Sequence, residues 1–128
     1  MATGLATLKT RADFLRVAAS RRRAVRPGLL LQAAPRPSGG DGDEVRVGFT
    51  ASRRVGNAVV RNRAKRRLRA AAAAVLGQAG QSGTDYVLIA RAATGELPFA
   101  ELVGDLKAAL RQVERRGGEP RPRRAEET

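Results

Sequence analysis

Residues 53–76 read RRVGNAVVRNRAKRRLRAAAAAVL, and this stretch predicts the longest helix of the chain. Asn57 is a suitable N-cap, because its side chain can accept hydrogen bonds from the free backbone N–H groups of a first helical turn. Gly77 is a suitable residue just beyond the end, and no Pro or Gly interrupts the residues between. We therefore expect a helix from about Ala58 to Leu76.

The predicted helix carries one narrow apolar stripe. At ~100° per residue, a set of small and medium apolar side chains falls within an arc of roughly 80°. A stripe of this width is suited to packing on a β-sheet. These side chains are Val60, Ala64, Leu68, Ala71 and Val75.

Basic side chains cover most of the rest of this helix. Positions 53–69 contain eight Arg and Lys residues, and no Asp or Glu occurs between Val45 and Thr84. Most runs of charge are solvated helix faces, but such faces usually mix both signs. A face of one sign repels itself, at a cost of about a few tenths of a kcal/mol for each pair at i, i+4. We therefore favour a polyanion, and a nucleic acid in particular, as the partner of this face.

The composition limits which classes of protein this chain can belong to. The chain has 128 residues, which predicts one domain, and 25 Lys and Arg against 12 Asp and Glu give a formal net charge of +13. A surplus of this size indicates RNA, DNA or an acidic membrane surface as the partner. The chain contains no Cys and no His, which excludes disulfides, thiol chemistry and the commonest metal ligand. No run approaches the ~18 apolar residues of a membrane span and no signal-peptide core is present, so we expect a cytoplasmic protein.

Hydrophobic spacing predicts the other elements. Residues 10–20 predict a short helix with Thr10 and Asp13 at the spacing of a capping box. Residues 25–34, which include three successive leucines, predict the first clear strand, and the nearly continuous apolar run at 86–90 is typical of a central strand. A last helix opens at Leu97-Pro98 and stops at Gly117. The remaining segments are predicted as a loose arm and two loops: Met1–Leu8, Pro35–Glu44 and Gly77–Thr84.

The segment from Val45 to Ser52 alternates between apolar and polar residues, which predicts a strand. One face, with Val45, Val47, Phe49 and Ala51, is apolar, and we expect the helices to cover it. The other face, with Arg46, Gly48, Thr50 and Ser52, is small and polar. It is flat enough for a ligand backbone to approach, although open sheet faces are also ordinary in solvated sheets.

These elements predict an α+β fold, a two-layer sandwich with a single β-sheet in the order αβββαβα. We expect residues 1–116 to form the domain and the Pro-, Arg- and Glu-rich residues 117–128 to form a disordered tail. The general rule for parallel strands predicts a right-handed crossover through the basic helix.

Residues 47–69, VGFTASRRVGNAVVRNRAKRRLR, resemble the signature of the bacterial ribonuclease P protein subunit. The resemblance rests on a strand that ends in a small polar and basic turn, then Gly-Asn-Ala-Val at 56–59, then Arg-Asn-Arg at 61–63 with further basic residues up to Arg69. The length and the flanking elements fit this family over about residues 8–113. The resemblance implies a ribosomal-protein-like fold with a rare left-handed βαβ crossover, and we adopt that handedness on this ground.

The resemblance also implies an accessory subunit of an endoribonuclease whose catalyst is RNA. In bacterial ribonuclease P, the RNA subunit binds the Mg²⁺ ions that activate water for cleavage at the mature 5′ end of tRNA. The protein helps to bind the 5′ leader of the precursor and lowers the Mg²⁺ requirement. The residues agree, since the protein itself shows no catalytic constellation and no carboxylate cluster for a metal. The expected partners are the catalytic RNA subunit and the precursor tRNA leader, with no membrane and no stable protein partner.

The resemblance assigns two groups of residues. The group implied to dock on the catalytic RNA, mostly through phosphates, is Arg61, Asn62, Arg63, Lys65, Arg66 and Arg69. The group implied to line a central cleft for the single-stranded leader is Phe14, Leu31, Thr50, Ser52, Arg53, Arg54 and Arg91. Ala18 and Leu31 stand where members of the family often carry aromatic residues. From the residues alone, we favour a core position for Phe14.

The residues are also compatible with other functions. A structural ribosomal protein that binds rRNA is also small, basic and cytoplasmic, and it is the main alternative. A DNA-binding module is less favoured, because the basic helix lacks a helix-turn-helix partner and base-reading variety. An autonomous protein nuclease is least favoured.

Overall fold

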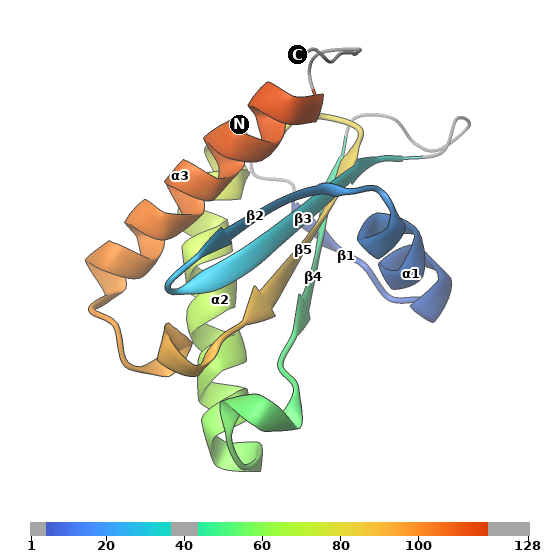
Figure 1. The fold of residues 1–128 in the computed structure, drawn as a ribbon. Helices are drawn as coiled ribbons and strands as arrows, with labels where there is room; N and C mark the ends of the chain where they lie inside the picture. The colour runs from blue at the N-terminus through green and yellow to red at the C-terminus, as the bar shows by residue number, and fades with distance from the viewer. Residues whose placement is uncertain (1–4, 37–43, 118–128) are drawn as a thin grey trace.

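A computed structural model describes residues 5–36 and 44–117 of the chain (Figure 1). The elements in chain order are β1 (Leu5–Thr7), α1 (Arg11–Ala19), β2 (Arg22–Arg26), β3 (Leu29–Pro35), β4 (Val45–Thr50), the short 3₁₀ helix η1 (Arg53–Val55), α2 (Ala58–Ala79), β5 (Thr84–Ala90), the 3₁₀ helix η2 (Ala92–Gly95) and α3 (Phe99–Gly117). The start of the predicted arm, most of the predicted loop at 35–44 and the tail after Gly117 lie outside the described residues.

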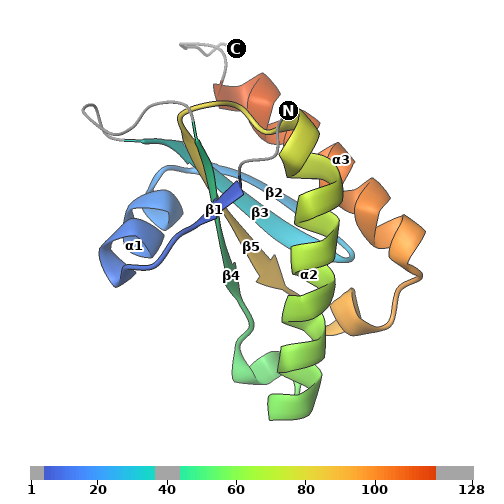
Figure 2. The same ribbon diagram turned by 180° about the vertical axis from the view of Figure 1, so that it is seen from behind.

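The strands form one mixed sheet in the order β1-β4-β5-β3-β2. β4 is parallel to both β1 and β5, whereas β3 is antiparallel to β5 and to β2. Helices α2 and α3 cover one face of this sheet, and α1 lies across part of the other face (Figures 1 and 2). The α+β class and the single sheet are confirmed, and β5 is the central strand as its apolar run predicted.

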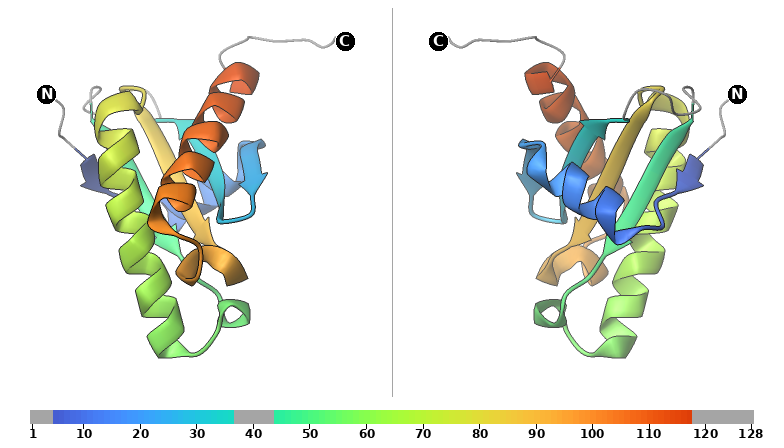
Figure 3. Two further views of the ribbon diagram at one scale, coloured as in Figure 1. Left: turned by 90° about the vertical axis from the view of Figure 1, so that its left-hand side faces the viewer. Right: turned by 90° about the vertical axis from the view of Figure 1, so that its right-hand side faces the viewer.

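The connection from β4 through α2 to β5 is left-handed. In the left panel of Figure 3, α2 and α3 lie in front of the sheet, and β4 and β5 both run downward with β5 to the right of β4. The chain returns upward through α2 on the near side of the sheet. A right-handed crossover with this strand direction would place β5 to the left of β4, so this connection is an exception to the general rule.

The main core lies between the sheet and the two covering helices. Alternate side chains of β4, led by Val47 and Phe49, meet the small residues Ala64, Ala71 and Ala72 of α2. The alanines bring α2 close to the sheet, and Leu68 fills the space between them. The predicted apolar stripe is therefore confirmed except for Val60, which is 37% exposed because the first turn of α2 projects past the end of the strands (Figure 3).

Several predicted boundaries are wrong. A short strand, β1, replaces the end of the predicted arm and pairs parallel with β4, so the order is βαβββαβα. The predicted strand at 25–34 is the larger part of a hairpin, β2 and β3, that turns at Pro27-Gly28. Helix α2 begins at Ala58 with Asn57 as its N-cap, as predicted, but it continues through Gly77 to Ala79, with Gly80 as its C-cap. Burial of Val75 and Leu76 outweighs the cost of about 1 kcal/mol for a glycine inside a helix.

Candidate nucleic-acid interface

The first half of α2 presents six polar and basic side chains, which we call the α2 basic surface. Its members are Arg61, Asn62, Arg63, Lys65, Arg66 and Arg69. Four of them, Asn62, Arg63, Arg66 and Arg69, are exposed, and Arg61 and Lys65 are half-buried. Within the described ranges no carboxylate forms an ion pair with any of them. The positive charge of this surface is therefore available to bind an anionic partner.

Two members of the α2 basic surface also have contacts inside the protein. Arg61 donates from Nη1 to the carbonyl oxygen of Gly56 at 3.0 Å, which holds the turn before α2. The guanidinium carbon of Arg69 lies 5.5 Å from the centre of the Phe49 ring, within the range of a cation–π contact. Both contacts fix the aliphatic stems while leaving donors on the guanidinium groups.

Arg67 is the one arginine between Arg61 and Arg69 that the resemblance leaves out of the RNA-binding group, and its contacts are internal. Its Nη1 donates to the carbonyl oxygen of Gly95 at 3.2 Å, and its Nη2 donates to that of Leu97. The side chain thereby ties α2 to η2 and to the start of α3. From the helix pattern alone, Arg67 was one of several basic residues on the exterior.

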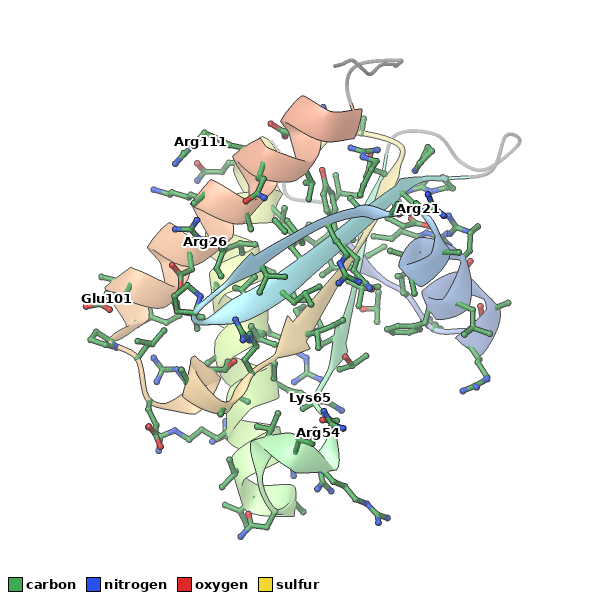
Figure 4. The ribbon with its side chains drawn as sticks, viewed as in Figure 1. Arg21, Arg26, Arg54, Lys65, Glu101 and Arg111 are labelled. Atoms are coloured by element: carbon green, nitrogen blue, oxygen red, sulfur yellow. The ribbon has the colours of Figure 1, made fainter. Side chains whose placement is uncertain are left out.

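A second group of residues lies on the sheet face that carries α1 and in the segments that follow β4 and β5, and we call it the cleft surface. It comprises Phe14, Thr50, Ser52, Arg53, Arg54 and Arg91. Because β4 and β5 are parallel and Thr50 lies opposite Ile89, the segments that follow both strands leave the sheet at the same edge. Figure 4 shows Arg54 and Lys65 at the end of the molecule where η1 and the start of α2 lie.

The side chains of the cleft surface are held in different ways. Ser52 caps η1 by accepting a hydrogen bond from the backbone N–H of Arg54 at 3.3 Å. Arg53 and Arg54 are exposed and make no side-chain hydrogen bond or ion pair within the described residues. Arg91 donates from Nη1 to the carbonyl oxygen of Arg26 at 2.7 Å, so its guanidinium is fixed beside the sheet. The result is a polar and cationic rim.

Phe14 lies directly on the sheet beside this rim. A Cβ atom added at Gly48 would lie 2.5 Å from Cζ of the Phe14 ring, so only glycine permits this approach. The ring packs against a small core cluster that includes Leu8, Val17 and Val87, yet it is only half-buried. Phe14 thus packs in the core and also keeps part of its ring accessible. A core position and a role in the leader-binding cleft are therefore compatible for this residue.

The assignment of Leu31 to the cleft is wrong. Its side chain is fully buried in the core beneath α2 and α3, on the opposite face of the sheet. Successive side chains of a strand alternate between faces, so a slip of one residue moves a side chain to the other face. Leu30, which lies opposite Ile89, and Gln32, which lies opposite Val87, face the same side as Thr50 and Gly48. Leu30 is half-buried, so it is the member of this strand that can reach a ligand.

A buried carboxylate fixes α1 on the sheet, and sequence reasoning missed it. Asp85 on β5 is fully buried and accepts hydrogen bonds from Arg46 on β4 and from Arg16 on α1. Arg36 adds a third cation at 3.6 Å. Burial alone would raise the pKa of Asp85, but the hydrogen bonds from Arg46 and Arg16 outweigh it and lower that pKa. The hydrogen bond with Asp85 also raises the pKa of Arg46, against the effect of its burial.

The same acidic residues do not suit a metal ion. Among the residues that the structure describes, no group of three or more His, Cys, Asp or Glu side chains could hold a metal. Asp13 lies near Asp85, but Arg16 and Arg46 pair with both carboxylates. Within residues 5–36 and 44–117, none of the helices has the length and apolar character that a membrane span requires.

Solved structures share this fold. The RNase P protein of Thermotoga maritima matches with a TM-score of 0.66 and 23% sequence identity, over 85% of this chain and 96% of that chain. The RNase P protein of Staphylococcus aureus matches with a TM-score of 0.66 and 23% identity, over 82% and 92% of the two chains. At these identities the likeness concerns the fold alone.

The sequence comparisons identify the family. A relative from Paramagnetospirillum magneticum, named ribonuclease P protein component, is 56% identical over 115 residues, which cover 88% of this chain and 86% of that protein. A relative of the same name from Gluconacetobacter diazotrophicus is 50% identical and covers 88% and 94% of the two chains. The family model for ribonuclease P matches residues 4–114. This chain therefore belongs to the ribonuclease P protein family.

Proposed function

We propose that this chain is the protein subunit of ribonuclease P. It assists a catalytic RNA subunit in the endonucleolytic removal of the 5′ leader from precursor tRNA. The observation that carries the proposal is the α2 basic surface, which displays its cations on one rigid helix without a pairing carboxylate among the described residues. An array of this kind suits the phosphates of a folded RNA. The names of the relatives support this function over that of a ribosomal protein.

The two surfaces bind different RNAs. The α2 basic surface docks on the catalytic RNA, with most of its arginines on phosphates and Asn62 as a directional donor and acceptor. The cleft surface holds the single-stranded leader, with Phe14 as a stacking platform and Arg53, Arg54 and Arg91 as its cationic rim. The cationic rim of the cleft surface adjoins the α2 basic surface, because η1, which carries Arg53 and Arg54, connects the end of β4 to the start of α2. The protein thereby presents the leader next to the catalytic RNA.

The chemistry belongs to the RNA subunit in this proposal. Mg²⁺ ions held mainly by that RNA supply the activated water. The protein residues bind and orient the substrate, and their positive charge offsets phosphate repulsion that Mg²⁺ would otherwise have to screen. The proposed compartment is the cytoplasm, where tRNA precursors are made in bacteria.

A cleavage assay tests the proposal. Precursor tRNA is incubated at low Mg²⁺ with a bacterial ribonuclease P RNA, with and without this protein. We expect the protein to restore cleavage at the mature 5′ end and to cleave nothing by itself. If the RNA is indifferent to a folded protein that still binds RNA tightly, the proposal fails. Cosedimentation of the protein with ribosomal subunits in place of the ribonuclease P RNA would then favour the ribosomal function.

A further inference from the structure

A pocket of about 490 Å³ lies between η1, the start of α2 and η2, beside the α2 basic surface. Its volume is within the range of sites that bind small molecules, about 300–1,000 Å³. Its lining residues are Val55, Val60, Arg63, Ala92, Gly95 and Glu96. The neighbouring Val59 is 76% exposed, an unusual position for a large apolar side chain amid arginines.

The walls of this pocket are fixed before any ligand binds. Arg61 ties the turn between η1 and α2 through the carbonyl oxygen of Gly56. Val60 packs on Gly56, where an added Cβ would lie 2.8 Å from the Cβ of Val60. On the other side, Arg67 ties η2 to α2 through the carbonyl oxygens of Gly95 and Leu97. Because α2 anchors both walls, a ligand meets a preorganised site.

Two charged side chains in the lining have no internal partner among the described residues. Arg63 and Glu96 are both exposed, and neither makes a side-chain hydrogen bond or ion pair within the part of the chain that the structure describes. A carboxylate beside a phosphate-binding surface repels phosphates, so phosphate contacts do not explain Glu96. A carboxylate is an acceptor only, and it suits a neutral partner that offers N–H donors.

We propose that this pocket binds an unpaired guanine base of the RNA partner. The proposal rests on the RNA-binding function proposed above and adds a base-specific contact to it. Unpaired bases of RNA are bound by stacking on arginine planes and by hydrogen bonds to their Watson–Crick edges. Arg63 stacks on the base, Val55 and Val60 contact its apolar face, and Glu96 accepts from the adjacent N1–H and N2–H groups.

The donor pattern selects guanine over the other bases. Guanine places two neighbouring N–H donors on its Watson–Crick edge, which match the two oxygens of a carboxylate. Adenine and cytosine offer one amino group beside a ring acceptor. Uracil offers one N–H between two carbonyl oxygens, which a carboxylate repels. The surrounding arginines hold the phosphates on either side of the base, so the charge pattern of the pocket fits RNA as its occupant.

The test is Glu96→Gln, with Glu101→Gln as the matched control. Both substitutions remove one exposed acid, but Glu101 lies on α3 (Figure 4) and outside the pocket. Electrostatics alone predicts that either variant binds the ribonuclease P RNA slightly more tightly. Loss of a bidentate base contact predicts that Glu96→Gln binds about tenfold more weakly while the dependence of binding on salt stays the same. Urea unfolding of both variants shows whether they are folded like the wild type.

Kethoxal, which adds to N1 and N2 of unpaired guanines, identifies the base. We expect wild type and Glu101→Gln to protect one reactive guanine of the RNA subunit, and Glu96→Gln to leave it reactive. Equal or tighter binding by Glu96→Gln overturns the proposal, and so does weaker binding without a change at any guanine. A wild-type protein that does not bind the RNA subunit refutes the proposed function itself, and this inference falls with it.

Discussion

Arg46 donates two hydrogen bonds to Asp85, from Nε to Oδ1 at 2.8 Å and from Nη2 to Oδ2 at 2.6 Å. The same carboxylate, fully buried, accepts a hydrogen bond from Arg16 of α1. The cluster therefore joins α1 to the two central parallel strands. Phe14 precedes Arg16 by two residues on the same helix, so this ion cluster helps to position the ring that lies over Gly48.

Removal of the buried carboxylate will destabilise the fold. We expect Asp85→Ala to lower the free energy of unfolding by about 3–5 kcal/mol, because Arg36 loses its counter-ion and Arg16 and Arg46 keep only Asp13. Urea denaturation measures this loss. Glu101→Ala is the control, since Glu101 is exposed, and it should change the value by about 0.5 kcal/mol or less. A loss for Asp85→Ala as small as that of the control would show that the cluster contributes little.

The same carboxylate gives stability a defined pH dependence. The folded state lowers the pKa of Asp85 below its unfolded value of about 3.9. Its contribution to stability is therefore fully present well above the unfolded pKa and is lost as the pH falls through that value toward the folded pKa. We expect the free energy of unfolding to fall more steeply below about pH 4 in the wild type than in Asp85→Asn. Parallel curves for the two proteins would contradict the role of Asp85.

Exposed arginines of α2 should account for the salt dependence of RNA binding. Arg66→Ala with Arg69→Ala removes two exposed cations that no described acid pairs with. The slope of log affinity against log salt for the ribonuclease P RNA should fall by about 1.5–2 units. The control is Lys107→Ala with Arg111→Ala, which removes the same charge from exposed positions of α3. Equal changes in the two double variants would mean that only net charge matters.

The Phe14 ring should distinguish precursor from mature tRNA. Stacking on one base is worth about 1–3 kcal/mol, so Phe14→Ala should weaken precursor binding by the holoenzyme by about 5- to 150-fold and leave mature tRNA binding unchanged. Leu15→Ala is the control on the same helix, because Leu15 is 55% exposed and lies outside the core clusters. If Phe14→Ala weakens both ligands equally, the ring serves only the core.

Much of the fold was predictable where the signal is local. The Asn57 cap fixes the start of α2, and the alternation from Val45 fixes which face of β4 is covered. β1 was not predictable, because three residues without alternation become a strand only through their pairing with β4. The end of α2 was missed because tertiary burial of Leu76 carries the helix past Gly77.

The family signature predicted which residues of the candidate site lie on the surface, with the exception of Leu31, but not what contacts each of them makes. The basic residues of α2 and the rim residues after β4 and β5 lie on the surface as expected. Leu31 was assigned to the wrong face, because three successive leucines give no indication of which one points to the core. The Asp85 cluster joins residues far apart in the chain, so no local sequence pattern predicts it.

The absence of cysteine from the chain allows the most direct test of the two-surface account. Three variants, Arg66→Cys, Ser52→Cys and Lys107→Cys, each provide one cysteine to which an iron chelate is attached. In the holoenzyme assembled with precursor tRNA, the chelate generates hydroxyl radicals that cut nearby RNA. We predict cuts in the catalytic RNA from position 66, cuts in the 5′ leader from position 52, and none from position 107 on α3. The same pattern from positions 66 and 107, or an uncut leader from position 52, would contradict the account.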